Sequence, residues 1–258
     1  MDHETNWIIA AAGTDAVRTR QAGLSCLHLC TQLSCDGRFA PLSHPVRAQG
    51  DFLGIADSGG IPKQCAIFAS QAVDTARSRK CRGILADFER PLLQDLTAAL
   101  DDACHKAQLQ FLIPLSLAEY APHACIVADT AISGGSLDGR FSELIDRFGR
   151  ERLAAQLVRS HADFPLPCSN PSGTPLDAAS VQTLLHQTGS TVFFSRELCA
   201  KYFTYSRENH AHFVLFDDVD TLRTKARVLR RLGISRLIAV YPDACEMGLL
   251  CAKSAAST

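Results

Sequence analysis

Two acidic residues, Asp87 and Glu89, stand two positions apart at the end of a short apolar run, Gly83–Ala86. In an extended strand, residues two apart point to the same side, so the two carboxylates would share one face. Neighbouring carboxylates resist double ionisation, which raises the pKa of one of them and keeps a proton on it near neutral pH. Such a group can act as a general acid, and cleavage of a glycosidic bond needs one. The alternative is structural: the pair ends a strand and forms salt bridges with Arg82 or Arg90.

Eight short apolar runs could form the strands that position this pair, because longer segments with helical spacing recur between them. This alternation predicts βα units around a parallel sheet. Helices are expected at Lys63–Arg79, Pro91–Lys106 and Thr221–Leu232. Eight strands is the number that closes a barrel. The expected strands are Trp7–Ala12, Leu24–Cys30, Phe52–Ala56, Arg82–Asp87, Gln110–Leu115, Cys125–Asp129, Ala154–Arg159 and Leu237–Val240.

The length of 258 residues suits one (β/α)₈ TIM barrel, and we expect residues 1–258 to form a single α/β domain. The stretch Phe164–Pro175 is rich in Pro, Ser and Gly and is predicted to be a loop after the seventh strand. Beyond about residue 175 the chain shows too few elements for a second core. In a TIM barrel the functional sites lie at the carboxyl ends of the strands, where Asp87 and Glu89 are expected.

The charge balance and the apolar runs exclude several classes of partner. The chain has 26 Lys and Arg residues and 27 Asp and Glu residues, a net charge of −1, so nucleic acid is not an expected partner. No apolar run reaches about 20 residues, and the first residues lack a basic segment, so neither a membrane span nor an export signal is predicted. We therefore expect a cytoplasmic protein. The sequence gives no indication of its oligomeric state.

Eleven cysteines are scattered along the chain, most of them within apolar segments, as Cys251 is. This favours reduced, buried thiols. The group most similar to a metal site consists of Cys26, His28, Cys30 and Cys35. It lacks the paired Cys-x-x-Cys spacing of a structural zinc site. The alternative is one face of a strand that carries small residues and a hydrogen-bonded histidine. We expect neither a metal nor a cofactor.

The segment around the acidic pair, RGILADFE, resembles the strand-four signature D-G-x-D-x-D-x-E of family 18 glycoside hydrolases, in which the final Glu is the acid. Asp87 and Glu89 match its last two carboxylates, whereas Arg82 and Leu85 stand where its first two aspartates are. Other segments are similar to the family in the same order. They are LSCLHLCTQLSCDGRFAPL (second strand and turn), ADSGG at 56–60 (S-x-G-G), FDDVDTLRTK at 216–225 (Y-D-D-x-x-S-x-x-x-K) and GISRLIAV at 233–240 (approach to strand eight).

The resemblance implies a mechanism in which the 2-acetamido group of the substrate attacks the anomeric carbon. Glu89 would protonate the leaving oxygen, and Asp87 would hold the acetamido nitrogen and stabilise the oxazolinium-like intermediate. Phe88, pointing away from both, would only pack.

Three further residues would line the substrate site by their places in the family's pattern. Asp57 follows the third strand. Asp129 lies on the sixth strand, where the family has a Tyr, although a cap of the strand end is the alternative. Tyr241 follows Val240, which occupies the place of the family's Trp on strand eight.

Two functions are consistent with this resemblance. The first is a glycosidase that cleaves β-linked N-acetylhexosamine glycans, of the chitin or peptidoglycan type. The second is a catalytically inactive carbohydrate-binding or structural protein on the same barrel, which the missing Tyr, Trp and two aspartates favour. The presence of both Asp87 and Glu89 favours the enzyme, because a protein that only binds glycans has no need of a protonated acid.

Overall fold

The computed structural model of the chain describes residues 5–33, 39–41, 49–57, 60–90, 93–168, 170 and 172–251. The chain groups into two compact units. The first comprises Asp2–Ala128, Gly149–Gln156 and Ser235–Thr258, and the second comprises mainly Asp129–Phe148 and Leu157–Ile234.

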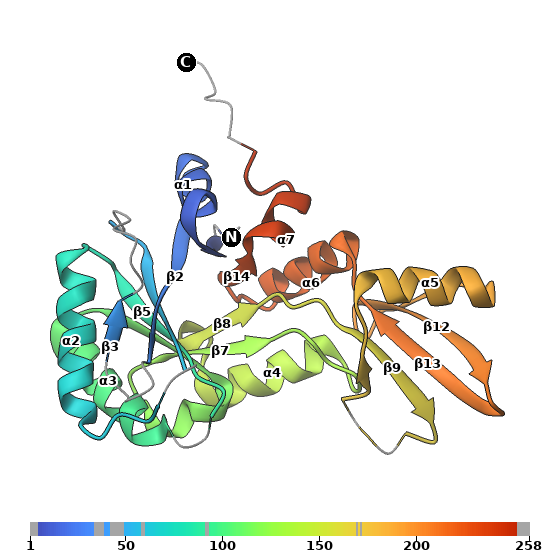
Figure 1. Ribbon diagram of the computed structural model, residues 1–258, viewed down its shortest axis with the longest axis horizontal. Helices are drawn as coiled ribbons and strands as arrows, with labels where there is room; N and C mark the ends of the chain where they lie inside the picture. Colours follow the sequence, from blue (N-terminus) through green and yellow to red (C-terminus); the bar gives the residue numbers. More distant parts are fainter. Residues whose placement is uncertain are drawn as a thin grey trace. The chain divides into compact units, whose positions relative to one another are not determined.

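Eight parallel strands close into a barrel, which lies in the first unit except for Asp129 at the end of β7 (Figure 1). The order is β1, β14, β8, β7, β6, β5, β4, β2, and a parallel pairing of β1 with β2 closes the circle. A short strand, β3 (Phe39–Pro41), pairs antiparallel with the end of β2. The strands are β1 (Asn6–Ala11), β2 (Ser25–Leu33), β4 (Phe52–Ala56), β5 (Gly83–Asp87), β6 (Gln110–Pro114), β7 (Cys125–Asp129), β8 (Leu153–Gln156) and β14 (Arg236–Val240). They overlap the eight predicted strands, so the TIM barrel is confirmed.

One apolar side chain from each barrel strand fills the interior. This inner layer consists of Ile8, Leu27, Phe52, Leu85, Leu112, Val127, Ala154 and Ile238. The barrel is therefore a packed core rather than a pore. Gly83 makes room for the largest of these side chains, because a Cβ at this position would lie 2.7 Å from the Phe52 ring. Since alternate residues of a strand share a face, the layer also fixes which residues further along each strand point inward.

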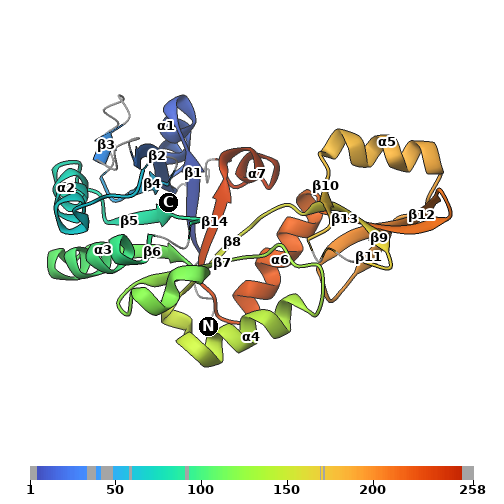
Figure 2. The ribbon, with the colours of Figure 1, turned by 60° about the horizontal axis from the view of Figure 1, so that its bottom comes forward.

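Helices α2 (Cys65–Ser78) and α3 (Gln94–Ala107) lie side by side outside β4 and β5 (Figures 1 and 2). Both were predicted from their apolar stripes. The stripes pack on the outward-facing residues of the two strands, and the buried cluster includes Phe68, Ala72, Leu96 and Leu100. The unit also contains α1 (Gly13–Gln21), η2 (Leu115–Tyr120), η3 (Arg150–Arg152) and α7 (Tyr241–Glu246).

The second unit contains a five-stranded antiparallel sheet with the order β10, β9, β13, β12, β11. Helix α5 (Ala178–Thr188) covers one face of this sheet, where Val181 packs with Phe203, Val214 and Phe216. Helices α4 (Leu137–Phe148) and α6 (Val219–Arg231) belong to the same unit. The strands are β9 (His161–Leu166), β10 (Thr174–Pro175), β11 (Phe193–Ser195), β12 (Ala200–Arg207) and β13 (His210–Phe216).

Two expectations about this region are wrong. The predicted loop Phe164–Pro175 contains the end of β9 and all of β10, and the chain beyond it forms α5 and three more strands. The reason lies in the pattern: β12 (AKYFTYSR) and β13 (HAHFVLF) mix polar and aromatic residues, as strands with one covered face do. The prediction was based on the continuous apolar runs of buried parallel strands. A single domain over residues 1–258 stays a prediction.

The buried histidine of the second strand is hydrogen-bonded, as one alternative predicted. His28 is 3% exposed, and its Nε2 lies 2.8 Å from Oδ2 of Asp51. The side chain of Cys30 and the whole of Cys35 lie outside the described residues, as do Pro91 and the Ser58–Gly59 part of the ADSGG motif.

None of the cysteines whose side chains the structure describes forms a disulfide. Cys26, Cys81, Cys104 and Cys199 are buried, as expected, but Cys251 is exposed. The prediction of burial is wrong there, although the apolar residues before it, Leu249 and Leu250, pack against the cluster of Ile9 and Ala239.

Within the described ranges, no helix is both long enough and apolar enough to span a bilayer.

Candidate active site

The acidic pair lies at the carboxyl end of β5, with the alternation that the sequence predicted. Asp87 is two positions from Leu85, which belongs to the inner layer, so it shares the inward-facing side of the strand. Phe88 is 1% exposed and packs in the outer cluster beneath the helices. Asp87 and Glu89 are both exposed. The strand end thus presents two carboxylates, while the aromatic residue between them anchors the chain to the core.

Asp57 holds the backbone that carries Glu89. It follows β4, whose last residue, Ala56, pairs in register with Asp87. Oδ2 of Asp57 accepts hydrogen bonds from the backbone N–H groups of Glu89 and Arg90, both at 3.0 Å, and from Nε of Arg90 at 3.3 Å. The Asp57 carbonyl oxygen accepts a further bond from Nη2 of Arg90. These contacts assign Asp57 a positioning role that the sequence did not indicate.

The contacts of Arg90 and Arg82 argue against the structural alternative, in which the acidic pair forms salt bridges with one of these arginines. Arg90 forms its ion pair with Asp57, and Arg82, at the opposite end of β5, donates to Oδ1 of Asn6 at 3.3 Å. Within the described residues, neither arginine pairs with Asp87 or Glu89. The two carboxylates therefore stay available to a ligand.

Removing the Asp57 carboxylate should release the Glu89 backbone. We expect Asp57→Ala to lower the free energy of unfolding by about 1–3 kcal/mol, because the donors of Glu89 and Arg90 lose a charged acceptor. Asp57→Asn, which keeps one acceptor oxygen, should lose less. Amide hydrogen exchange at Glu89 and Arg90 checks the local effect, and unchanged exchange in Asp57→Ala would show that this carboxylate does not hold the segment.

The pKa of the Asp87 carboxyl is raised above its ordinary value. Partial burial is the largest cause, and the nearby negative charges of Glu89 and Asp57 add to it. One member of the pair therefore keeps its proton to higher pH than an isolated aspartate does. A site with one carboxyl that holds its proton beside a second carboxyl has the parts for acid catalysis and for stabilising a positive charge.

The raised pKa has a consequence for stability. The folded chain binds the Asp87 proton more tightly than the unfolded chain, whose ordinary value is 3.8. Stability from this group is therefore fully present below pH 3.8 and is lost as the pH rises through the folded pKa. We expect Asp87→Asn to be more stable than the wild type at pH 7, by less than about 1 kcal/mol because the side chain is exposed.

Urea unfolding at two pH values checks this expectation. The two proteins should differ at pH 7 and converge at about pH 3, where both side chains are neutral. Asp102→Asn, which changes an exposed carboxylate on α3, is the matched control. A wild type more stable than Asp87→Asn at pH 7 would contradict the raised pKa.

Asp129 lies at the end of β7, two positions after Val127 of the inner layer. Its Oδ1 accepts a hydrogen bond from the backbone N–H of Ala131 at 3.0 Å, and its Oδ2 lies 3.8 Å from Nη2 of Arg140. These are the contacts of a strand-end cap. Its role as a substrate contact stays a prediction.

Tyr241 is the first residue of α7 and directly follows β14. Ile238 belongs to the inner layer, so Val240, the last residue of β14, shares the inward side. The Tyr241 ring packs with the cluster that contains Ile9 and Ala239. The structure does not bring this ring together with Asp87 and Glu89. A substrate contact by Tyr241 stays a prediction that its packing does not support.

The FDDVDTLRTK segment is structural. Asp218 caps helix α6: its carboxylate accepts from the backbone N–H of Thr221, whose hydroxyl accepts from the N–H of Asp218. The preceding residue, Asp217, is buried and pairs with Nζ of Lys225 at 2.7 Å. The spacing of the motif thus follows from one helix cap and one buried ion pair, and it indicates no second catalytic group.

Comparison with known proteins supports the fold. No family model and no curated protein matches the chain. Among solved structures, the spore cortex-lytic enzyme SleL of Bacillus megaterium has a TM-score of 0.60 at 13% identity, over 93% of this chain and 71% of SleL. A chitinase of Chromobacterium violaceum has a TM-score of 0.59 at 14% identity, over 91% of this chain and 93% of its own.

A class V chitinase of Nicotiana tobaccum, solved in complex with NAG4, has a TM-score of 0.62 at 12% identity, over 96% of this chain and 97% of its own. The resemblance to family 18 glycoside hydrolases is confirmed at the level of the fold, which this chain shares with these proteins at low identity.

Proposed function

We propose that this protein is a glycoside hydrolase that cleaves β-linked N-acetylhexosamine glycans. The observation that carries the proposal is the exposed pair of Asp87 and Glu89 at the carboxyl end of β5, with the Glu89 backbone held by the Asp57 carboxylate. The shared fold supports it, because the solved neighbours include chitinases, one of them bound to NAG4, and a spore cortex-lytic enzyme. Chitin-type glycans and peptidoglycan are therefore the substrate classes we favour.

In the proposed mechanism the acetamido group of the substrate is the nucleophile, so the protein supplies an acid and an orienting group. Glu89 donates a proton to the leaving oxygen, and its backbone is held by the Asp57 carboxylate. Asp87 holds the acetamido nitrogen and stabilises the positive charge that develops on the oxazolinium-like intermediate. Asp57 acts through the backbone of Glu89 and is a positioning residue.

The test is direct: the protein is incubated with N-acetylglucosamine oligomers and with peptidoglycan glycan strands, and products are identified by mass spectrometry. Cleavage at the glycosidic bond supports the proposal. Binding of either glycan without any cleavage would indicate the second candidate, a carbohydrate-binding protein, and the absence of both would contradict both functions. A cytoplasmic location stays a prediction.

A further inference from the structure

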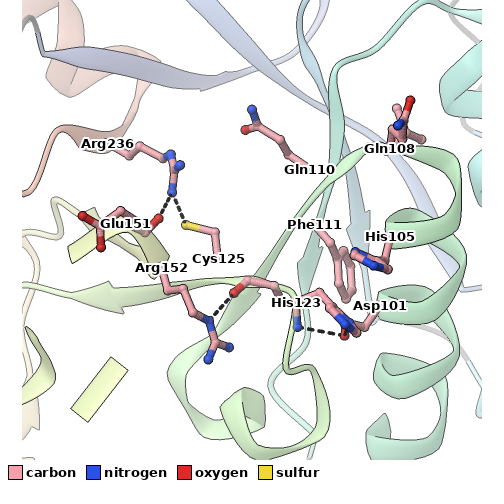
Figure 3. Close-up of a pocket in the computed structure, with 12 residues that line it drawn as sticks. Asp101, His105, Gln108, Gln110, Phe111, His123, Cys125, Glu151, Arg152 and Arg236 are labelled. Atoms are coloured by element: carbon pink, nitrogen blue, oxygen red, sulfur yellow. Dashed lines mark hydrogen bonds and ion pairs between the residues drawn. The ribbon is translucent and has the colours of Figure 1, made fainter. Parts of the chain in front are cut away.

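A cavity lies at the opposite end of the barrel from Asp87 and Glu89. Its volume is about 280 Å³, and Figure 3 shows the residues that line it. Four of them lie at or next to the amino ends of adjacent strands, β6, β7, β8 and β14. Those ends contribute Gln110, Cys125, Arg152 and Arg236. Activity in TIM barrels is located at the carboxyl ends of the strands, so the proposed hydrolysis does not use this cavity.

Two guanidinium groups in the cavity are held in place by neutral acceptors. Nη1 of Arg236 donates to the carbonyl oxygen of Glu151 at 2.7 Å and contacts Sγ of Cys125 at 3.1 Å. Arg152 donates through Nε and Nη2 to the carbonyl oxygens of Ala124 and Ala121, at 3.2 and 3.1 Å. Within the described part of the chain, neither arginine forms an ion pair with a carboxylate. Both side chains are therefore held in place by neutral acceptors and not by a direct ion pair.

Charge around Arg236 reinforces this point. The carboxylate of Glu151 points away from Arg236 (Figure 3). A third cation, Arg82, lies over the Phe52 ring of the barrel interior, with its guanidinium carbon 4.5 Å from the ring centre. Burial lowers the pKa of Arg82, Asp51 raises it, and the charge of Arg236 has a smaller lowering effect. An anion in the cavity would lie beside Arg236 and offset its charge.

Two imidazole rings complete the lining. His105 and His123 are stacked, with ring centres 3.9 Å apart. Nδ1 of His123 lies 2.9 Å from Oδ2 of Asp101, and because an ionised carboxylate only accepts, Nδ1 carries the proton and Nε2 of the neutral ring is left as an acceptor for a ligand hydroxyl group. Asp101 is 1% exposed, and its Oδ1 has no hydrogen-bond partner within the described residues. A hydroxyl group on the bound molecule could donate a hydrogen bond to this Oδ1 atom.

We propose that this cavity binds a small oxyanion, a phosphate or carboxylate group on a molecule of at most a few carbon atoms. The planar fork of arginine matches both groups through paired hydrogen bonds. The volume is at the lower end of small-molecule pockets, which span about 300–1,000 Å³, so an oligosaccharide would not fit. The site is independent of the hydrolase, since its residues lie at the other ends of the strands.

The probes are inorganic phosphate and malonate, titrated while chloride keeps the ionic strength constant. Proton–carbon NMR of the histidine rings reports on binding. We expect saturable shifts of His105 and His123, with a dissociation constant on the order of 1 mM for the better anion. The anion that binds more tightly identifies the group as phosphate or carboxylate.

Variants make the test specific. Arg236→Gln should weaken binding by roughly tenfold or more, and Arg236→Lys, which keeps the charge, should weaken it less. Arg227→Gln, on the exposed side of α6, is the matched control and should bind as the wild type does. Glu89→Gln should also bind normally, so failure of the proposed hydrolysis leaves this inference untouched.

Shifts that never saturate with either anion would overturn the proposal, as would equal binding by a natively folded Arg236→Gln. If that variant does not fold, His105→Ala replaces it, because the His105 side chain is exposed. Unchanged anion affinity in His105→Ala, read from the His123 signal, would then overturn it.

Discussion

Replacing Glu89 with Gln should lower the rate of oligosaccharide hydrolysis by roughly 10²–10⁴-fold, because a glutamine cannot donate the proton that the leaving oxygen needs. Substrate affinity should change little, since the amide keeps the shape of the side chain and its backbone stays bound to Asp57. Initial rates and equilibrium binding of the same N-acetylglucosamine oligomer measure the two effects separately.

The leaving group makes this prediction specific to acid catalysis. An aryl glycoside whose phenol is acidic needs little protonation, so Glu89→Gln should lose far less activity on it than on an oligosaccharide. Asp102→Asn, an exposed carboxylate on α3, is the matched control and should retain the wild-type rate. Equal losses on both substrates would show that Glu89 does not act as the proton donor.

Replacing Lys225 with Met should destabilise the protein by about 3–5 kcal/mol, because it leaves Asp217 charged and unpaired in the interior. The two side chains are 1% and 0% exposed, and Oδ2 of Asp217 also accepts from the backbone N–H of Ser160 at 2.7 Å. At about 2–4 °C per kcal/mol for a domain of this size, the melting temperature should fall by about 6–20 °C.

Two variants test the cause of this loss. Lys201 pairs with Asp218, the next residue along, but both side chains are about one-third exposed, so Lys201→Met should cost only about 0–1 kcal/mol. The double variant Asp217→Asn with Lys225→Met keeps an acceptor for Ser160 and removes the buried charge, so it should be more stable than Lys225→Met alone. Equal destabilisation by the two lysine variants would contradict the buried-pair explanation.

The barrel could be predicted because its parallel strands are covered on both faces and read as short apolar runs. The sheet of the second unit could not be found in the same way. Its strands β12 and β13 have one face covered by α5 and mix polar and aromatic residues, so they do not read as continuous apolar strands. Local pattern reveals which residues are apolar, but not which faces of a sheet are covered.

The candidate site likewise has features that the sequence predicted and features that it did not. The alternation of exposed Asp87, buried Phe88 and exposed Glu89 agrees with the two-residue period from which the sequence predicted the pair, and a common side for the two carboxylates stays a prediction. The contact of Asp57 with the backbone of Glu89 depends on the register between β4 and β5, which the sequence does not state. Tyr241 differs again: the strand ends at Val240, and Tyr241 begins α7 and packs with Ile9 and Ala239.

The central claim is that the carboxylate pair at the end of β5 cleaves glycosidic bonds with help from the substrate's acetamido group. Time-resolved proton NMR of an N-acetylglucosamine oligomer during hydrolysis by the wild-type protein tests it most directly, since attack by the acetamido group followed by water retains the β configuration. We predict that the β anomer of the product appears first. The α anomer appearing first, or an oligomer left intact, would contradict the account.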